Sequence, residues 1–224
     1  MKTTRKLNLA SNLMFIALLA AAAGCKSGGN YETAGATAEG LQASADKIQT
    51  AKGQLDSVLA TLNDLVNNPT NLPTQYATFS GAVTDLQASG KNVDARVAEM
   101  RAKGMEYFKT WDEQAAQIKN EDIKSRSEAR KKEVQDQFTK VKLSYTEARD
   151  AYRPLMSDLL DIRTALGTDL TTGGVAAIKG AAQKANQDAI PLKKAGDDLS
   201  AQLKDLGAAM SAAGPAPAPA SAPQ

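Results

Sequence analysis

Apolar residues recur at steps of three and four from about residue 31 to residue 210. Residues at this spacing fall on one face of an α-helix, and its persistence over many turns is typical of helices that pack along a heptad seam. No stretch shows the alternation of apolar and polar residues that marks a half-buried strand. The pattern therefore predicts an all-α fold made of long helices.

The seam divides into four helices because three segments interrupt it. The first break is rich in Asn and Pro, and the third is rich in Thr and Gly. At the second break, Asn120 is predicted to cap the next helix, because Asn is a favourable N-cap and the two acids after it suit a first helical turn. Short connections favour antiparallel neighbours, so we expect an elongated up-down-up-down bundle or coiled coil. The alternative is two hairpins with little contact between them. The predicted helices are residues 32–67, 73–119, 121–167 and 175–210, with the last turn at 168–174.

Five residues disturb the seam or the helices that carry it. Lys52 is the polar residue that interrupts the seam of the first helix. Its long aliphatic side chain can place the ammonium group outside the seam. Gly90 and Gly104 occupy seam positions in the second helix and predict either a close approach by a neighbouring backbone or local weakness. Pro154 and Pro191 lie inside the third and fourth helices and predict kinks, which could open a groove between them.

The N-terminus has the pattern of a secretory signal: basic residues, a short apolar run and small residues before Cys25. Ala22-Ala23-Gly24-Cys25 resembles the lipobox of bacterial lipoproteins, in which the cysteine becomes the acylated first residue. The alternative is an ordinary signal peptide or a membrane helix, although an apolar run of about eleven residues is short for a span of roughly twenty. The predicted divisions are a signal peptide (1–24), a lipidated tether (25–30), a helical bundle (31–211) and a disordered Pro-Ala tail (212–224).

Charge and composition exclude several functions. The chain has 27 basic and 25 acidic residues, and removal of the three basic residues in 1–24 leaves 24 against 25, a net charge of −1. A near-neutral chain argues against binding to nucleic acid. With no histidine and one cysteine, which lipidation would consume, there is no imidazole base, cysteine nucleophile or His/Cys zinc site. We expect no enzyme activity and no cofactor.

The second and third helices are predicted to be about ten residues longer than the others. Their hairpin tip, residues 108–132, should therefore project by roughly 15–20 Å, at the same end as Cys25. Basic and aromatic residues near a lipid anchor are the types that contact anionic headgroups. Alternatively, the aromatic residues form the core of the hairpin and the mixed charges are a solvated face. The candidate membrane-contact residues are Lys124, Arg126, Arg130, Lys131 and Lys132.

The second and third predicted helices and the break between them contain the residues Phe108-x-x-Trp111, Asn120, Ser125 or Ser127, Tyr145, Arg149-x-x-Tyr152-x-Pro154-Leu155, Asp161 and Leu166. With these residues the chain resembles a family of exported bacterial proteins with a helical, coiled-coil domain of unknown function. The resemblance spans about residues 31–206 and implies a single helical domain at the cell envelope, without catalytic residues. The lipobox and the Pro-Ala tail depart from the family pattern.

These observations favour a non-enzymatic, lipid-anchored envelope protein that acts as a structural or protein-interaction coiled-coil module. Its partners would be the membrane, through lipidated Cys25, and an envelope protein or a second copy of the chain. The alternative is a membrane- or lipid-binding module that uses the basic tip. Lys26 is not the Asp that retains many lipoproteins in the inner membrane, which favours the periplasmic face of the outer membrane over the cell surface or the inner membrane.

Overall fold

The computed structural model describes residues 30–211, and this range folds into four helices without a strand. The all-α prediction is therefore confirmed for this part of the chain. The predicted signal peptide, Cys25 and the Pro-Ala tail lie outside the described residues. The helices are α1 (Asn30–Asn67), α2 (Leu72–Ala115), α3 (Glu121–Thr168) and α4 (Thr172–Met210).

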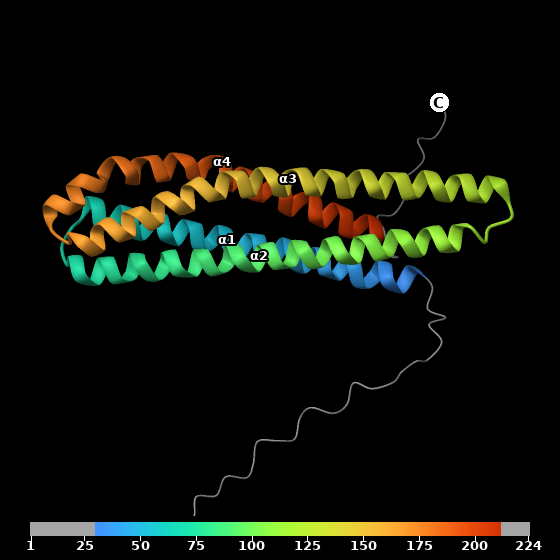
Figure 1. Cartoon of the computed structure of the whole chain (residues 1–224), viewed down its shortest axis with the longest axis horizontal. Coiled ribbons are helices and arrows are strands. Elements are labelled where there is room, and N and C mark those ends of the chain that lie inside the picture. Colours follow the sequence, from blue (N-terminus) through green and yellow to red (C-terminus); the bar gives the residue numbers. More distant parts are fainter. Residues whose placement is uncertain (1–29, 212–224) are drawn as a thin grey trace, which may run out of the picture.

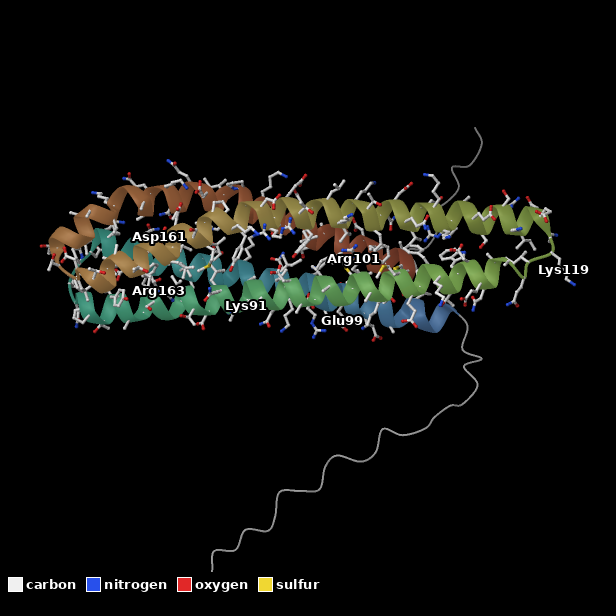
Figure 2. All side chains as sticks on the ribbon, in the orientation of Figure 1. Lys91, Glu99, Arg101, Lys119, Asp161 and Arg163 are labelled. Atoms are coloured by element: carbon white, nitrogen blue, oxygen red, sulfur yellow. The ribbon has the colours of Figure 1, made fainter. Side chains whose placement is uncertain are left out.

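The four helices form one elongated bundle in which successive helices run antiparallel (Figure 1). α1 packs against α2 and α4, and α3 packs against α4 and α2, whereas the two diagonal pairs do not meet. The contact between α1 and α4 is as extensive as that within the α1–α2 hairpin. This excludes two loosely associated hairpins and confirms the up-down-up-down arrangement. Charged side chains such as Lys91, Glu99 and Arg101 project from the outside of the bundle (Figure 2).

The buried residues form two clusters along the long axis. The turn-end core lies towards the α1–α2 and α3–α4 turns, and leucines such as Leu62, Leu159 and Leu166 are fully buried in it. The tip-end core lies towards the α2–α3 hairpin tip and includes Leu41 and Leu203. Almost all of these residues occupy the predicted seam. The heptad pattern therefore identified the interior of both clusters.

The two seam glycines of α2 have a different role from the one we expected. A Cβ atom on Gly90 would lie 2.5 Å from the Tyr152 hydroxyl, and one on Gly104 would lie 2.7 Å from Cε1 of Phe138. The close neighbours are therefore aromatic side chains of α3 rather than a helix backbone. The glycines make room for rings that stand between α2 and α3, and this is the adjacent pair with the fewest backbone contacts.

Polar side chains cap three helix starts. Asn71 accepts from the Thr74 N–H at the start of α2 (3.3 Å), and the side chain of Asn120 accepts from two backbone N–H groups of α3 at 3.0 and 3.1 Å. Thr171 accepts from the Gly174 N–H at the start of α4 (3.2 Å). Each cap satisfies donors that the first helical turn leaves without intrahelical partners. The predicted cap at Asn120 is confirmed.

Two helix boundaries differ from the prediction by three or four residues, and the others agree within two. α2 ends at Ala115 instead of residue 119, because the bundle no longer covers this part of the hairpin and the apolar seam loses its phase here. α4 begins at Thr172 instead of residue 175, so two glycines assigned to the turn lie in its first turn. Gly174 is required there, since a Cβ atom would lie 2.0 Å from the Asp169 carbonyl oxygen.

The interior prolines lie on the outside of the bundle. Pro154 in α3 and Pro191 in α4 are both exposed, and both helices continue through them. α3 and α4 change direction near the middle of the bundle, as expected where a proline removes a backbone hydrogen bond (Figure 1).

Candidate functional site

The hairpin tip projects beyond the other two helices (Figure 1). Nη2 of Arg130 donates a hydrogen bond to the Ala209 carbonyl oxygen at 2.8 Å, and α4 ends one residue later. Nine residues of α3, 121–129, therefore lie beyond this contact, which corresponds to about 14 Å at 1.5 Å per residue. α1 also begins at this end of the bundle. The predicted overhang and its position beside the start of the bundle are confirmed.

Aromatic side chains hold the two helices of the hairpin, α2 and α3, together. Nε1 of Trp111 donates to Oγ of Ser127 at 2.9 Å, which links α2 to α3. The ring of Tyr107 meets that of Trp111 edge-on at 5.5 Å, and Phe108 meets Phe138 at 5.3 Å. These contacts support the interpretation that the aromatic residues form the hairpin core. They leave the charged and aliphatic side chains as the outer surface of the tip.

Four of the five candidate membrane-contact residues form ion pairs within the chain. Lys124 is the exception among residues 30–211. Exposed pairs of this kind contribute little stability, but each acid cancels a charge that a headgroup would otherwise meet. The tip therefore offers much less free positive charge than its sequence suggests. The pairs are Arg126–Asp122 (3.1 Å), Arg130–Glu133 (2.8 Å), Lys131–Asp112 and Lys132–Asp136 (2.9 Å).

The outermost part of the tip combines an apolar side chain with free cations. Ile123, in the first turn of α3, is 54% exposed. Lys124 follows it, and Lys119 lies at the far end of the tip (Figure 2). An exposed large apolar side chain on a projecting hairpin is a candidate contact point, although one residue does not make an apolar patch.

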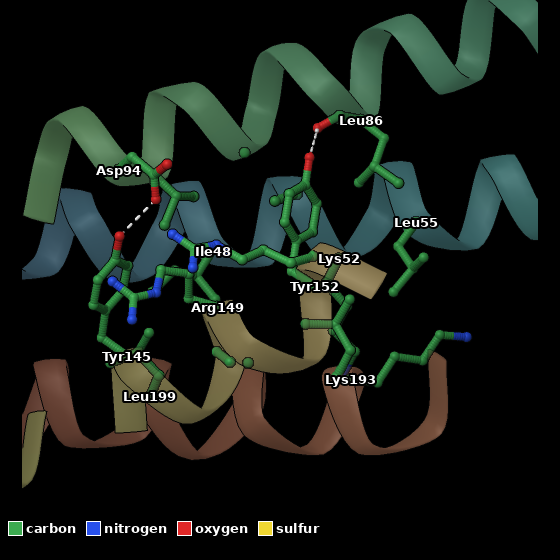
Figure 3. A pocket seen from close by; sticks show the side chains of 17 residues that line it. Ile48, Lys52, Leu55, Leu86, Asp94, Tyr145, Arg149, Tyr152, Lys193 and Leu199 are labelled. Atoms are coloured by element: carbon green, nitrogen blue, oxygen red, sulfur yellow. Dashed lines mark hydrogen bonds between the residues drawn. The ribbon is translucent and has the colours of Figure 1, made fainter. Parts of the chain in front are cut away.

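A second feature, which we call the central cavity, lies where the two core clusters meet (Figure 3). All four helices contribute to its wall, and its volume is about 160 Å³. The kinks at Pro154 and Pro191 were expected to be able to open a groove, but neither proline lines this cavity. A better signal in the sequence was that Lys52, Gly90 and Gly196 each occupy a seam position where a large apolar residue would be expected, on three different helices.

Two tyrosines of α3 reach across to α2 at this level (Figure 3). The Tyr145 hydroxyl donates to the Asp94 carboxylate at 2.6 Å, and the Tyr152 hydroxyl lies 3.5 Å from the Leu86 carbonyl oxygen. Burial, followed by the hydrogen bond to the Asp94 carboxylate, raises the pKa of Tyr145 to about 12. Both effects disfavour a tyrosinate beside a carboxylate. These hydroxyls therefore serve as neutral donors rather than as bases.

Two lysines beside the cavity form ion pairs on the α1–α4 side. Nζ of Lys52 lies 2.6 Å from the Asp197 carboxylate, and Lys193 pairs with Asp56. The hydrogen bond from Lys52 lowers the pKa of Asp197. The prediction that the Lys52 ammonium leaves the seam is confirmed, because its stem lines the cavity while its charge reaches an exposed acid.

The described helices contain neither a group of His, Cys, Asp and Glu residues arranged to hold a metal ion nor a segment that is long and apolar enough to cross a membrane. The central cavity and the hairpin tip remain the two candidate sites.

Comparison with known proteins identifies a family without assigning an activity. A family profile described as "Protein of unknown function (DUF2959)" matches residues 36–202. No match is found among curated proteins or among solved structures. The matched range covers most of all four helices and the central cavity, whereas the lipobox lies outside it. The predicted resemblance to a helical family of unknown function is confirmed at that level: the chain belongs to the DUF2959 family.

Proposed function

We propose that this protein is a non-enzymatic, lipid-anchored envelope protein whose bundle acts as a structural or protein-interaction module, and that the hairpin tip contacts its partner. The observation that carries the proposal is the overhang. The tip is the part of the bundle that neither α1 nor α4 covers, and it bears the exposed Ile123. The partner is an envelope protein or a second copy of the chain.

The position of the lipobox supports this arrangement. α1 begins at Asn30, only five residues after Cys25, and even a fully extended segment of that length spans at most about 18 Å. A lipid anchor on Cys25 would therefore hold the tip end of the bundle near the membrane. The turn end would project away from it. Lys26 after the cysteine favours the periplasmic face of the outer membrane as the location.

Photo-crosslinking in cells tests the proposal at two exposed isoleucines. Ile123 lies on the tip, whereas Ile190, which is 69% exposed, lies on α4 near the middle of the bundle and is the matched control. With p-benzoylphenylalanine at position 123, we expect a discrete protein adduct. The same substitution at position 190 should give little or none. The mass of the adduct distinguishes a second copy of the chain from another protein.

The anchor is tested in the same cells. Cys25→Ser should release the protein from the membrane fraction and should weaken crosslinking from position 123, because the tip would no longer be held near its partner. No adduct from position 123, or equal adducts from both positions, would contradict the role of the tip. Adducts of position 123 with lipid alone would favour the second candidate, in which Ile123 and the unpaired Lys124 contact the membrane surface.

A further inference from the structure

The central cavity lies at a layer of the bundle to which three helices contribute small residues, although the Tyr152 ring fills the space beside Gly90. Gly90 of α2, Ala148 of α3 and Gly196 of α4 reach this layer, and on α1 the seam position belongs to Lys52, whose ammonium turns outward to Asp197. The layers on either side are filled by the leucine-rich clusters. A close-packed interior leaves few voids larger than a water molecule, so an opening of this size is a structural exception.

The wall of the cavity is apolar and its size limits what can enter. A closed cavity of about 150 Å³ lined by aliphatic and aromatic side chains is dry and accommodates benzene, so about 160 Å³ suits a ring or an alkyl group of roughly six to eight carbons. The central cavity is partly open, which allows the remainder of a ligand to extend outward. The apolar lining residues are Ile48, Leu55, Leu86, Val93, Leu192 and Leu199.

The rim of the cavity carries free positive charge on one helix. Its lysines are compensated by aspartates, and its one acid, Asp94, accepts from Tyr145. Arg149 and Arg153 line the cavity one turn apart on α3. The Arg149 guanidinium lies over the Tyr145 ring, 5.9 Å from its centroid, and its ion pair with the exposed Asp150 is long, at 3.4 Å. Arg153 has no ion pair among residues 30–211. Two guanidinium groups one turn apart present forked donors that suit a carboxylate or a phosphate.

We propose that the central cavity binds the apolar end of a single-chain anionic amphiphile, whose carboxylate or phosphate is held by Arg149 and Arg153. The apolar wall favours an alkyl chain, and the volume of the cavity limits how much of that alkyl chain is enclosed. The two arginines favour a negatively charged headgroup. A free fatty acid and a lysophospholipid share this chemistry. The site is independent of the hairpin tip, because it is built from the middle of all four helices.

The first experiment is calorimetric titration of the full chain carrying Cys25→Ser, which cannot be acylated. Octanoate and octanol, both kept below the concentrations at which they aggregate, are the probes. We expect one octanoate per chain and about tenfold weaker binding of octanol, because octanol lacks the charge that forms strong hydrogen bonds with arginine. Octyl phosphate should behave like octanoate. No octanoate binding, or equal binding of octanoate and octanol, would overturn the proposal.

Matched variants locate the site. Arg149→Gln with Arg153→Gln should weaken octanoate about tenfold and leave octanol unchanged, whereas Lys140→Gln with Lys142→Gln, on the exposed face of the same helix, should change neither. If the arginine pair had no effect on octanoate, the proposed headgroup site would be wrong.

Filling the cavity should abolish binding of both probes. Gly196→Leu places a side chain in the cavity, where a Cβ atom meets only an ordinary contact of 3.7 Å with Cγ2 of Ile48. Gly180→Leu is the control on the same helix, because a Cβ atom there has no neighbour within 4 Å. If Gly196→Leu does not fold, as judged by circular dichroism, Ala148→Met fills the same space from α3. Unchanged octanoate binding in a folded, filled variant would contradict the proposal.

Discussion

The α1–α4 and α2–α3 interfaces of the bundle are packed in different ways. On the α1–α4 side the helices approach closely through small residues: a Cβ atom on Gly207 would lie 3.3 Å from the Ala38 carbonyl oxygen. Asn63 and Asn186 exchange hydrogen bonds of 2.9 and 3.0 Å across this interface. On the α2–α3 side, aromatic rings stand between helices that share few backbone contacts. The α1 and α4 helices therefore lie close enough for their backbones to approach, whereas aromatic side chains separate α2 from α3.

The difference explains where the candidate sites lie. The α1 and α4 helices approach closely at Gly207, which leaves little room between them there, but nearer the middle of the bundle they supply part of the cavity wall. Rings on α3 that meet glycines on α2 leave irregular spaces, and the central cavity lies where the Tyr145 and Tyr152 hydroxyls bridge the two helices. The same two helices extend past the bundle to form the tip. The α2–α3 side therefore carries the hairpin tip and the two tyrosine bridges, whereas the cavity wall is shared by all four helices.

The largest predicted effects come from truncating one residue on each side of the tip-end core. Leu203→Ala should lower the free energy of unfolding by about 3 kcal/mol, because Leu203 is fully buried and its closely packed surroundings cannot collapse into the cavity. Phe138→Ala should cost about 2 kcal/mol, below the usual cost for a buried Phe, because its ring is only half-buried and water can enter the space. Urea denaturation measures both, and a larger loss for Phe138→Ala would reverse the comparison.

A smaller effect is expected from adding one methyl group opposite a ring. Gly104→Ala should destabilise the fold by about 1–2 kcal/mol, because a Cβ atom 2.7 Å from Cε1 of Phe138 forces the ring or the helix to move, which outweighs the gain in helix propensity. Gly180→Ala, where nothing lies within 4 Å, should instead stabilise by up to about 1 kcal/mol. Thermal denaturation should show a lower melting temperature for Gly104→Ala and a higher one for Gly180→Ala.

A double-mutant cycle isolates the contact itself. In the background of Phe138→Leu, whose smaller and more flexible side chain can move aside, most of the destabilisation by Gly104→Ala should disappear. If Gly104→Ala is as stabilising as Gly180→Ala, the ring does not require the glycine. The α2–α3 side would then be loosely packed rather than fitted around its aromatic residues.

The hydrophobic pattern predicted most of the fold because helix packing follows spacing. Seam residues such as Leu41, Leu59 and Leu159 are buried as the 3.5-residue repeat requires. The ends of helices were less predictable. Gly174 reads as a turn residue, yet it lies in the first turn of α4, because its missing Cβ lets the Asp169 carbonyl oxygen approach. Sequence identifies a glycine but does not show which atom needs the space.

The sites were harder to predict than the fold, because they depend on which helices meet. Arg130 was selected as a candidate membrane contact, but in the bundle it binds the last turn of α4 through the Ala209 carbonyl. Lys131 likewise reaches Asp112 across the hairpin. Conversely, the central cavity depends on Gly90 and Gly196 reaching the same layer, which requires the register between helices. The seam of one helix shows which of its residues face inward, but it does not show which residue of another helix lies opposite each of them.

The smallest predicted effect concerns the hydrogen bond that joins α3 to α2 at the cavity, and it is seen only at alkaline pH. The pKa of Tyr145 is raised to about 12, first by burial and then by the Asp94 carboxylate, whereas the unfolded chain should titrate near 10. Between these values the unfolded state has lost the proton that the folded state retains. Stability from this bond is therefore complete below pH 10 and falls as pH rises from about 10 to about 12.

Tyr145→Phe should make this part of the stability-against-pH curve flatter, and Asp94→Asn should lower the pKa of Tyr145 without returning it to 10, because burial remains. The effect should be smaller than those of the packing variants, since the hydroxyl is only partly buried and its charge is screened. Tyrosinate absorbance and urea denaturation at several pH values measure it, with Asp85→Asn, an exposed acid of α2, as control. If Tyr145→Phe leaves the alkaline loss unchanged, the side-chain bridge from Tyr145 to Asp94 does not help to hold α2 against α3.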